Sequence, residues 1–170
     1  GLDDTRRALA DSIANRASDL TEILRAIHAH PETAYRERFA SSTLVEAVRT
    51  AHPDLTVTHP AFGIDTAFAV ELTSADYDPE KHRTIAILSE YDALPGIGHG
   101  CGHNVIATAG LGAFLALADT LAATPDAFSG RVLYYGTPAE ESEAGKELMA
   151  RAGAFDSVDA AIMVHPYFMD

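Results

Sequence analysis

The sequence predicts a layered α/β domain in which helices cover a central sheet, and three observations lead to that prediction. Short apolar runs alternate with helical patterns along the chain, as they do in α/β folds. The run at 85–88 is apolar on both faces, which is typical of a central strand. The pattern at 105–121 is apolar nearly all round, which indicates a buried helix. With 170 residues, the chain is long enough for one domain with a substantial core.

The first half of the chain is predicted to hold two helices and two strands. Leu9, Leu20 and Ile27 belong to a series of apolar residues at helical spacing, and Pro31 ends that series. Around Phe68, apolar side chains alternate with small or polar ones, as in a half-buried strand. The expected elements are a helix over about 4–29, a helix within 32–50, a strand over 55–58, a strand over 68–72 and a polar hairpin loop over 73–83.

The second half is predicted to alternate strictly between strands and helices. Asn104 is the expected N-cap of the long apolar helix, because its side chain can accept a backbone hydrogen bond. Gly153 is expected to close a shorter helix. The expected elements are a strand over 85–88, a helix over 105–121, a strand over 131–135, a helix over 146–154 and a strand over 160–164.

Composition excludes several classes of partner. The chain is 47% hydrophobic and 22% charged, as soluble domains are, and its net charge is −13. That charge argues against binding to nucleic acid or to an anionic membrane surface. The single cysteine cannot form an internal disulfide, so a reducing, cytoplasmic location is expected. No run approaches the about 18 apolar residues of a membrane span, and the N-terminus lacks the features of a signal peptide.

The stretch from Ser89 to Asn104 is the main candidate for a functional site. It holds two acidic residues, closely spaced glycines, two histidines and the only cysteine. Thiolate and imidazole are ligands that zinc prefers, and glycine allows the tight turns that bring short side chains to one point. This loop is therefore predicted to hold half of a metal site.

Further candidate side chains follow other predicted strands. In open α/β sheets, functional groups collect at the carboxyl ends of the strands. Taken singly, each candidate has a structural interpretation, since a lone cysteine is usually buried, paired glutamates are usually solvated and a histidine is often structural. Their shared placement after three strands favours a site. The candidates are Asp92, Cys101, His103, Glu140, Glu141 and His165.

Two other chemistries fit the same loop less well. In a dinucleotide-binding loop, the third required glycine would fall on Cys101 or on His103. A nucleophilic Cys101 activated by His103 would need a base only two residues away in a tight loop, and it would leave Glu140 and Glu141 unexplained.

Three ordered motifs give the chain a family resemblance. Residues 90–104 closely resemble the signature of the aminoacylase and carboxypeptidase-type di-zinc amidohydrolases, peptidase family M20. Residues 136–141 are similar to the second motif of that family, and 153–155 with 163–166 to the third. His30-Pro31-Glu32 with Glu37 resembles its opening turn, and the nearest branch is that of the aminobenzoyl-glutamate hydrolases and the Xaa-Arg or β-alanyl-lysine dipeptidases.

The resemblance implies a fold, a reaction and a role for each candidate. It implies a layered α/β/α zinc-peptidase-like catalytic domain that hydrolyses amide bonds in N-acyl amino acids or dipeptides. Two zinc ions are expected, with other divalent metals such as manganese as alternatives. Glu90 stands where other branches have a metal-binding histidine, so its role stays open. The implied roles are metal ligand for Cys101, His103, Glu141 and His165, general base for Glu140 and orienting acid for Asp92.

Chains of this family are longer, and the expectations on domains and partners follow from that. Residues 1–170 are expected to form the N-terminal part of the catalytic domain, without the lid or dimerisation domain and the C-terminal part. Alone they are expected to be inactive, with a sheet edge covered by the rest of the protein or by self-association, and the full-length protein is expected to be a homodimer. The alternative is a non-catalytic relative that keeps the fold to bind a ligand or partner, but the intact base and ligands favour an enzyme.

Overall fold

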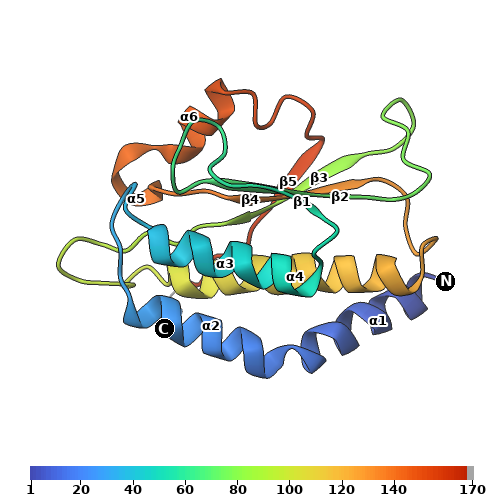
Figure 1. The fold of residues 1–170 in the computed structure, drawn as a ribbon, viewed down its shortest axis with the longest axis horizontal. Coiled ribbons are helices and arrows are strands. Elements are labelled where there is room, and N and C mark those ends of the chain that lie inside the picture. Colours follow the sequence, from blue (N-terminus) through green and yellow to red (C-terminus); the bar gives the residue numbers. More distant parts are fainter. Residues whose placement is uncertain (168–170) are drawn as a thin grey trace.

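In the computed structural model, which describes residues 1–167, the chain forms a five-stranded sheet with helices on both faces. Helices α1 to α4 cover one face and α6 lies on the other, so the predicted α/β class is confirmed (Figure 1). The helices are α1 (Leu2–Asn15), α2 (Ala17–Ala29), α3 (Arg38–Ala51), α4 (His103–Ala123), α5 (Glu140–Glu143) and α6 (Gly145–Arg151). The strands are β1 (Thr56–Thr58), β2 (Phe68–Thr73), β3 (Thr84–Ser89), β4 (Arg131–Gly136) and β5 (Ala160–Ile162).

The order of the strands differs from the simplest interpretation of the sequence. The sheet runs β1-β2-β4-β3-β5, so β4 lies between β2 and β3. The prediction of a hairpin loop over 73–83 was therefore wrong, because β2 pairs antiparallel with β4 and not with β3. Strands β3, β4 and β5 are parallel, and α4 is the crossover that joins β3 to β4. Parallel strands need such a long connection, and the carboxyl ends of these three strands meet at one edge.

The first predicted helix is two helices. Arg16 interrupts it with φ −96° and ψ 1°, between α1 and α2. Its guanidinium donates two hydrogen bonds to the Asp119 carboxylate on α4, both 2.8 Å long. Ser12 and His52 contact the same carboxylate at 2.6 and 2.7 Å. The bend lets both short helices follow the surface of α4, which the helical spacing of apolar residues could not reveal.

Helix α4 forms the centre of the larger core. It packs against β3 and β4 on one side and against the three N-terminal helices on the other. Its buried residues share one core cluster with those of β2. By length and composition α4 could also cross a membrane, but 67% of its most apolar window is buried, as in a core helix. The helix begins at His103 after Gly102, which has φ 75°, so the expected cap at Asn104 is corrected. A Cβ at position 102 would lie 2.6 Å from Pro166, so glycine is required there.

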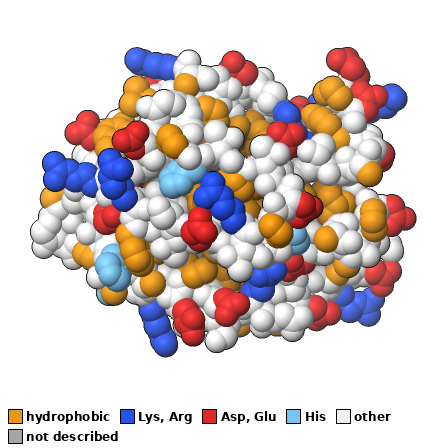
Figure 2. All heavy atoms as spheres, in the orientation of Figure 1, with side chains coloured by type: hydrophobic (Ala, Val, Ile, Leu, Met, Phe, Trp, Pro, Cys, Tyr) orange, Lys and Arg blue, Asp and Glu red, His pale blue; other side chains and the backbone are white. Residues whose placement is uncertain are grey.

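A smaller core lies on the opposite face, between the sheet and α6. Leu88, Leu133 and Met149 are among its buried residues. Strands β3 and β4 are therefore covered on both faces, whereas the residues of β5 are exposed at the sheet edge. On the face of the molecule seen in Figure 2, acidic and basic side chains are interspersed.

Candidate metal centre

The candidate site lies where β3, β4 and β5 end. Strand β3 leads directly to Glu90 and Asp92, and the glycine-rich loop that follows brings the chain back to His103 at the start of α4. Strand β4 leads to Glu140 and Glu141 on the short helix α5, which was not expected from the sequence. The segment after β5 carries His165 to the same edge. The topology thus accounts for the convergence, because parallel strands place their carboxyl ends side by side.

His103 lies at the centre of the site. Its side chain is buried, and Nδ1 lies 2.9 Å from Asp92 Oδ1. Since a carboxylate accepts hydrogen bonds, Nδ1 is the donor, which leaves Nε2 to face the centre of the site. Asp92 Oδ2 accepts a second hydrogen bond, 3.0 Å long, from the backbone N–H of Glu141. Asp92 therefore fixes both the imidazole and the turn that carries the two glutamates.

Three carboxylates surround His103 Nε2. The nitrogen lies 3.2 Å from Glu90 Oε2, 3.3 Å from Glu141 Oε1 and 3.6 Å from Glu140 Oε2. Among the described residues, neither Nε2 nor Glu90 Oε2 has a partner at hydrogen-bonding geometry. A buried nitrogen lone pair beside several carboxylate oxygens is a donor set that suits a divalent cation.

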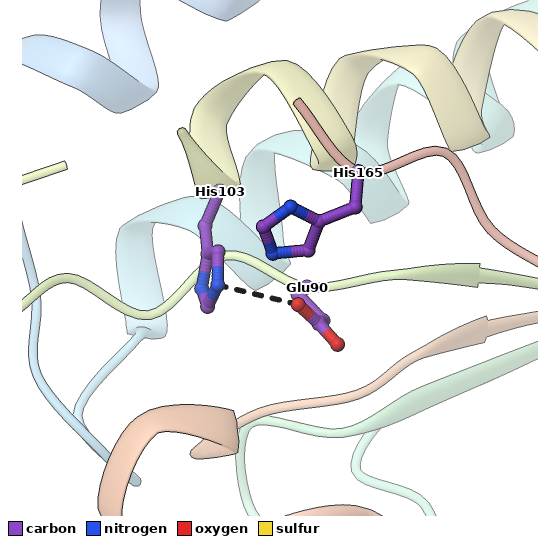
Figure 3. A group of neighbouring side chains, drawn as sticks. All are labelled: Glu90, His103 and His165. Atoms are coloured by element: carbon purple, nitrogen blue, oxygen red, sulfur yellow. Dashed lines mark ion pairs between the residues drawn. The ribbon is translucent and has the colours of Figure 1, made fainter. Parts of the chain in front are cut away.

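Two overlapping groups of donors could hold a metal ion, and both include His103. One consists of Glu90, His103 and His165, and the other of His103, Glu140 and Glu141; within each, donor atoms lie within 4.8 Å of one another. Figure 3 shows the first group, with the imidazoles of His103 and His165 both turned toward the Glu90 carboxylate. The two imidazoles are perpendicular, with centroids 6.1 Å apart.

The electrostatics of the site follow from this crowding. Burial opposes the charge on His103, but its hydrogen bond to Asp92 and the nearby carboxylates outweigh burial and raise its pKa. Burial also opposes the charge on Asp92, yet the hydrogen bonds from His103 and from the Glu141 backbone lower its pKa. Burial and the charge of Glu90 raise the pKa of Glu140. Excess negative charge is thus concentrated around one buried imidazole.

Cys101 lies beside these groups and belongs to neither of them. The adjacent Glu141 carboxylate, together with burial, raises the pKa of the Cys101 thiol to about 11. Of the predicted metal ligands, the structure brings His103 together with Glu141 in one group and with His165 in the other, and it places Cys101 against Glu141.

Glu90, whose role the sequence left open, and Lys146, which the sequence did not single out, extend the site. Glu90 is 2% exposed, and its second oxygen contacts the ammonium of Lys146 from the first turn of α6. The position of Glu90, between a buried strand and Asp92, could have identified it as a site residue from the sequence. Nothing in the sequence indicated Lys146, because its role depends on α6 packing against the end of β3.

Comparison with known proteins shows which families the chain resembles. The model of the family described as "Peptidase family M20/M25/M40" matches residues 86–168. The Xaa-Arg dipeptidase of Mus musculus is 38% identical over 166 residues, which are 95% of this chain and 38% of that protein. One subunit of the p-aminobenzoyl-glutamate hydrolase of Escherichia coli (strain K12) is 36% identical over 177 residues, which cover 94% of this chain and 35% of that protein. The chain thus spans little more than a third of these relatives.

Solved structures share the fold. A dinuclear metal-binding peptidase of the M20 family from Bacillus subtilis superposes with a TM-score of 0.69 at 21% identity, over 85% of this chain and 41% of that one. An aminobenzoyl-glutamate utilization protein from Klebsiella pneumoniae gives a TM-score of 0.70 at 20% identity, over 92% and 46%. The fold and the cluster of histidine and carboxylate donors define a layered α/β domain with a candidate metal centre. The matches confirm the family resemblance: this chain is similar to M20 peptidases, among them an Xaa-Arg dipeptidase and a subunit of a p-aminobenzoyl-glutamate hydrolase.

Proposed function

We propose that the chain carries the metal-binding part of a hydrolase that cleaves amide bonds in N-acyl amino acids or dipeptides. The observation that carries the proposal is the buried Nε2 of His103, which faces the carboxylates of Glu90, Glu140 and Glu141. The relatives named as a dipeptidase and as an aminobenzoyl-glutamate hydrolase support the same substrate class. A cavity of about 340 Å³ beside the site, lined by Cys101, Val105, His165 and other residues, could receive part of a small substrate.

The donors fit zinc, and the proposal assigns two ions to the complete site, with manganese as the alternative metal. Imidazole, thiolate and carboxylate are all zinc ligands, and the unpartnered His103 Nε2 and Glu90 Oε2 are the atoms that a cation would satisfy. When bound, the metal supplies Lewis-acid polarisation of the substrate carbonyl and lowers the pKa of water. The proposed ligands are Cys101, His103, Glu141 and His165.

The chain's own residues have separate tasks in this proposal. The Glu140 side chain is 41% exposed, against 20% for Glu141, so Glu140 is the carboxylate more open to water and substrate. Glu140 acts as the general base, taking a proton from water and passing it to the leaving amine. Asp92 keeps the proton of His103 on Nδ1 and holds the backbone of Glu141. Both hydrogen bonds hold the His103 imidazole and the Glu141 backbone in place during proton transfer.

The two glutamates give the sharpest test of these roles. Glu140→Gln should lower kcat by roughly 10²–10⁴-fold while the metal content persists, since an amide cannot accept the proton of water. Glu141→Gln should instead weaken metal retention, measured by elemental analysis after dialysis. Glu143→Gln is the matched control, because Glu143 lies on the same short helix and outside both donor groups. Equal loss of metal in the Glu140 and Glu141 variants would contradict the division of roles.

The proposal extends to the whole protein. Residues 1–170 would supply the N-terminal part of a catalytic domain in a cytoplasmic homodimer. The net charge of −13 and the single cysteine support a soluble protein in a reducing compartment. Gel filtration with light scattering on the protein at its natural length tests the dimer.

A further inference from the structure

Glu37 is a buried carboxylate that the proposed mechanism does not use. It is 0% exposed and lies at the N-terminus of α3, far in sequence from the proposed ligands. Its Oε1 accepts a hydrogen bond of 2.8 Å from the backbone N–H of Ala139, which directly precedes Glu140 and Glu141. Its Oε2 accepts a hydrogen bond of 3.0 Å from Thr66 Oγ1. Burying a carboxylate costs free energy unless it is hydrogen-bonded. The two hydrogen bonds offset that cost, and one of them joins Glu37 to the residue before the two glutamates.

Ala139 has an unusual backbone conformation. Its φ of 57° and ψ of 46° are left-handed, which costs a residue with a Cβ roughly 1–2 kcal/mol. The turn is closed on its other side by Gly145, whose N–H donates to the Ala139 carbonyl at 3.2 Å. A Cβ at Gly145 would lie 1.9 Å from the Pro138 carbonyl oxygen, so the chain is packed tightly here. Such strain persists only where surrounding contacts hold it.

The left-handed residue redirects the chain between β4 and α5. After it, Glu140 and Glu141 point toward His103, and the Glu141 N–H reaches Asp92. Two carboxylates therefore hold the backbone around the glutamates. Glu37 accepts a hydrogen bond from Ala139, and Asp92 accepts one from Glu141. Neighbouring contacts support the same arrangement, since the Tyr35 hydroxyl donates to the Glu143 carbonyl at 2.9 Å.

We infer that Glu37 is a positioning residue that holds Ala139 in its left-handed conformation and so aims the Glu140 and Glu141 carboxylates at the metal centre. This inference rests on the proposed function. Glu37 does not touch the centre itself; it acts through the backbone of Ala139. The Glu140 and Glu141 carboxylates are thereby held in position before metal or substrate binds.

Hydrogen bonding, and not charge, is what this role needs. A glutamine at position 37 could accept from the Ala139 N–H with its oxygen and donate to the Thr66 hydroxyl with its nitrogen, because a hydroxyl can also accept. An aspartate would keep the charge but withdraw its oxygens by one methylene. An alanine would leave the buried N–H of Ala139 without an acceptor. The three substitutions thus separate geometry from charge.

The experiment compares Glu37→Ala, Glu37→Gln and Thr66→Val with the wild type at natural length. Metal affinity is measured with Co²⁺ by chelator competition, together with kcat, KM and urea unfolding. Glu37→Ala should weaken Co²⁺ binding by roughly 10–100-fold, as loss of groups that orient metal ligands does, and should lower kcat more than it changes KM. Glu37→Gln should restore both. Thr66→Val removes the other hydrogen bond of Glu37 and should leave Co²⁺ affinity close to that of the wild type.

Two results would overturn the inference. One is a Glu37→Ala variant that binds Co²⁺ as tightly as Thr66→Val. The other applies if Glu37→Ala does not fold: Glu37→Asp would then be compared with Glu37→Gln, and normal affinity in the aspartate variant with loss in the glutamine variant would show that charge matters. A wild type that binds no Co²⁺ and hydrolyses no amide would instead refute the proposed function, so the two failures are distinct.

Discussion

Lys146 is the basic side chain that meets the crowded carboxylates of the candidate centre. Its ammonium contacts Glu90, while the other oxygen of Glu90 faces His103. The Lys146 side chain is 31% exposed and that of Glu90 is 2% exposed, so this ion pair is partly shielded from solvent. Lys146 therefore places a positive charge beside the carboxylates of the site.

Lys146→Met should destabilise the metal-free protein by about 1–3 kcal/mol, because Glu90 would keep a buried charge without its partner. For a chain of this size, that corresponds to a fall of roughly 2–12 °C in Tm. Excess zinc should recover part of the loss, because the cation would supply the missing positive charge. Differential scanning calorimetry with chelator and with zinc measures both effects.

Lys81→Met is the matched control. Lys81 pairs with Asp78 on an exposed turn, and its side chain is 74% exposed, so its removal should change Tm little. A Lys146→Met protein with the same Tm loss in zinc and in chelator would show that the pair with Glu90 is unconnected to the metal centre.

The sequence identified some residues of the site and not others, for a physical reason. Asp92 and the two glutamates come just after strands, and His103 follows the glycine-rich loop after β3, so local pattern and parallel topology predicted that they meet. The role of Glu37 depends on a contact with Ala139, 102 positions away in the chain, and that of Lys146 on a contact with Glu90, 56 positions away. No local pattern encodes such pairs. The metal-binding roles, including that of Cys101, stay predictions.

At the scale of elements, α4 approaches β3 closely. A Cβ at Gly110 would lie 2.2 Å from Ser89 Oγ and 3.1 Å from the Leu88 carbonyl oxygen. Ser89 is itself fixed, because its hydroxyl donates to the Ala107 carbonyl and contacts the Tyr134 hydroxyl. This contact places the start of α4 against the end of β3, where Glu90 and His103 face each other.

Gly110→Ala should therefore destabilise the fold by roughly 1–3 kcal/mol, since the helix would have to move away from the strand. Gly112→Ala, two residues later, is the control. Its Cβ would meet the flexible Leu20 side chain at 3.1 Å, and alanine favours a helix by about 1 kcal/mol, so its net effect should be small. Urea unfolding compares the two variants, and equal losses would contradict a special constraint at the strand.

Apolar periodicity predicted the strands and the central helix but not their partners. It could not show the break at Arg16, which depends on Asp119, 103 positions away. It also placed a hairpin between β2 and β3, because a polar stretch between two strands looks the same whether or not a third strand enters between them. The later strand β4 took that place by pairing with both.

For the whole molecule, Asp119 joins the N-terminal helices to the rest of the fold. Its carboxylate is bonded to Ser12 on α1, to Arg16 at the bend and to His52 after α3. The hydrogen bond from Arg16, opposed by burial, keeps the pKa of Asp119 well below its ordinary value of 3.8. Because the folded pKa is lowered, the stabilisation is fully present above about pH 4 and is lost as the pH falls toward the folded pKa.

Asp119→Asn should accordingly be less stable than the wild type at pH 7, and the difference should shrink below about pH 4. Unfolding midpoints in urea at pH 7, 5 and 3 measure it, with Asp126→Asn, an exposed position just after α4, as the control. A difference that stays constant down to pH 3 would show that the charge of Asp119 is not what holds the helices.

Strand β4 lies between β2 and β3, and this arrangement has a practical consequence for handling the protein. Thr73 and Thr84 both lie opposite Arg131, so the connection between them starts and returns at the amino end of β4. It projects away from the edge that carries α5 and the candidate centre (Figure 1). Its tip at Glu80 and Lys81 is exposed. A fluorophore or a surface anchor attached at this tip would leave the opposite rim open to the solution, where metal and substrate arrive.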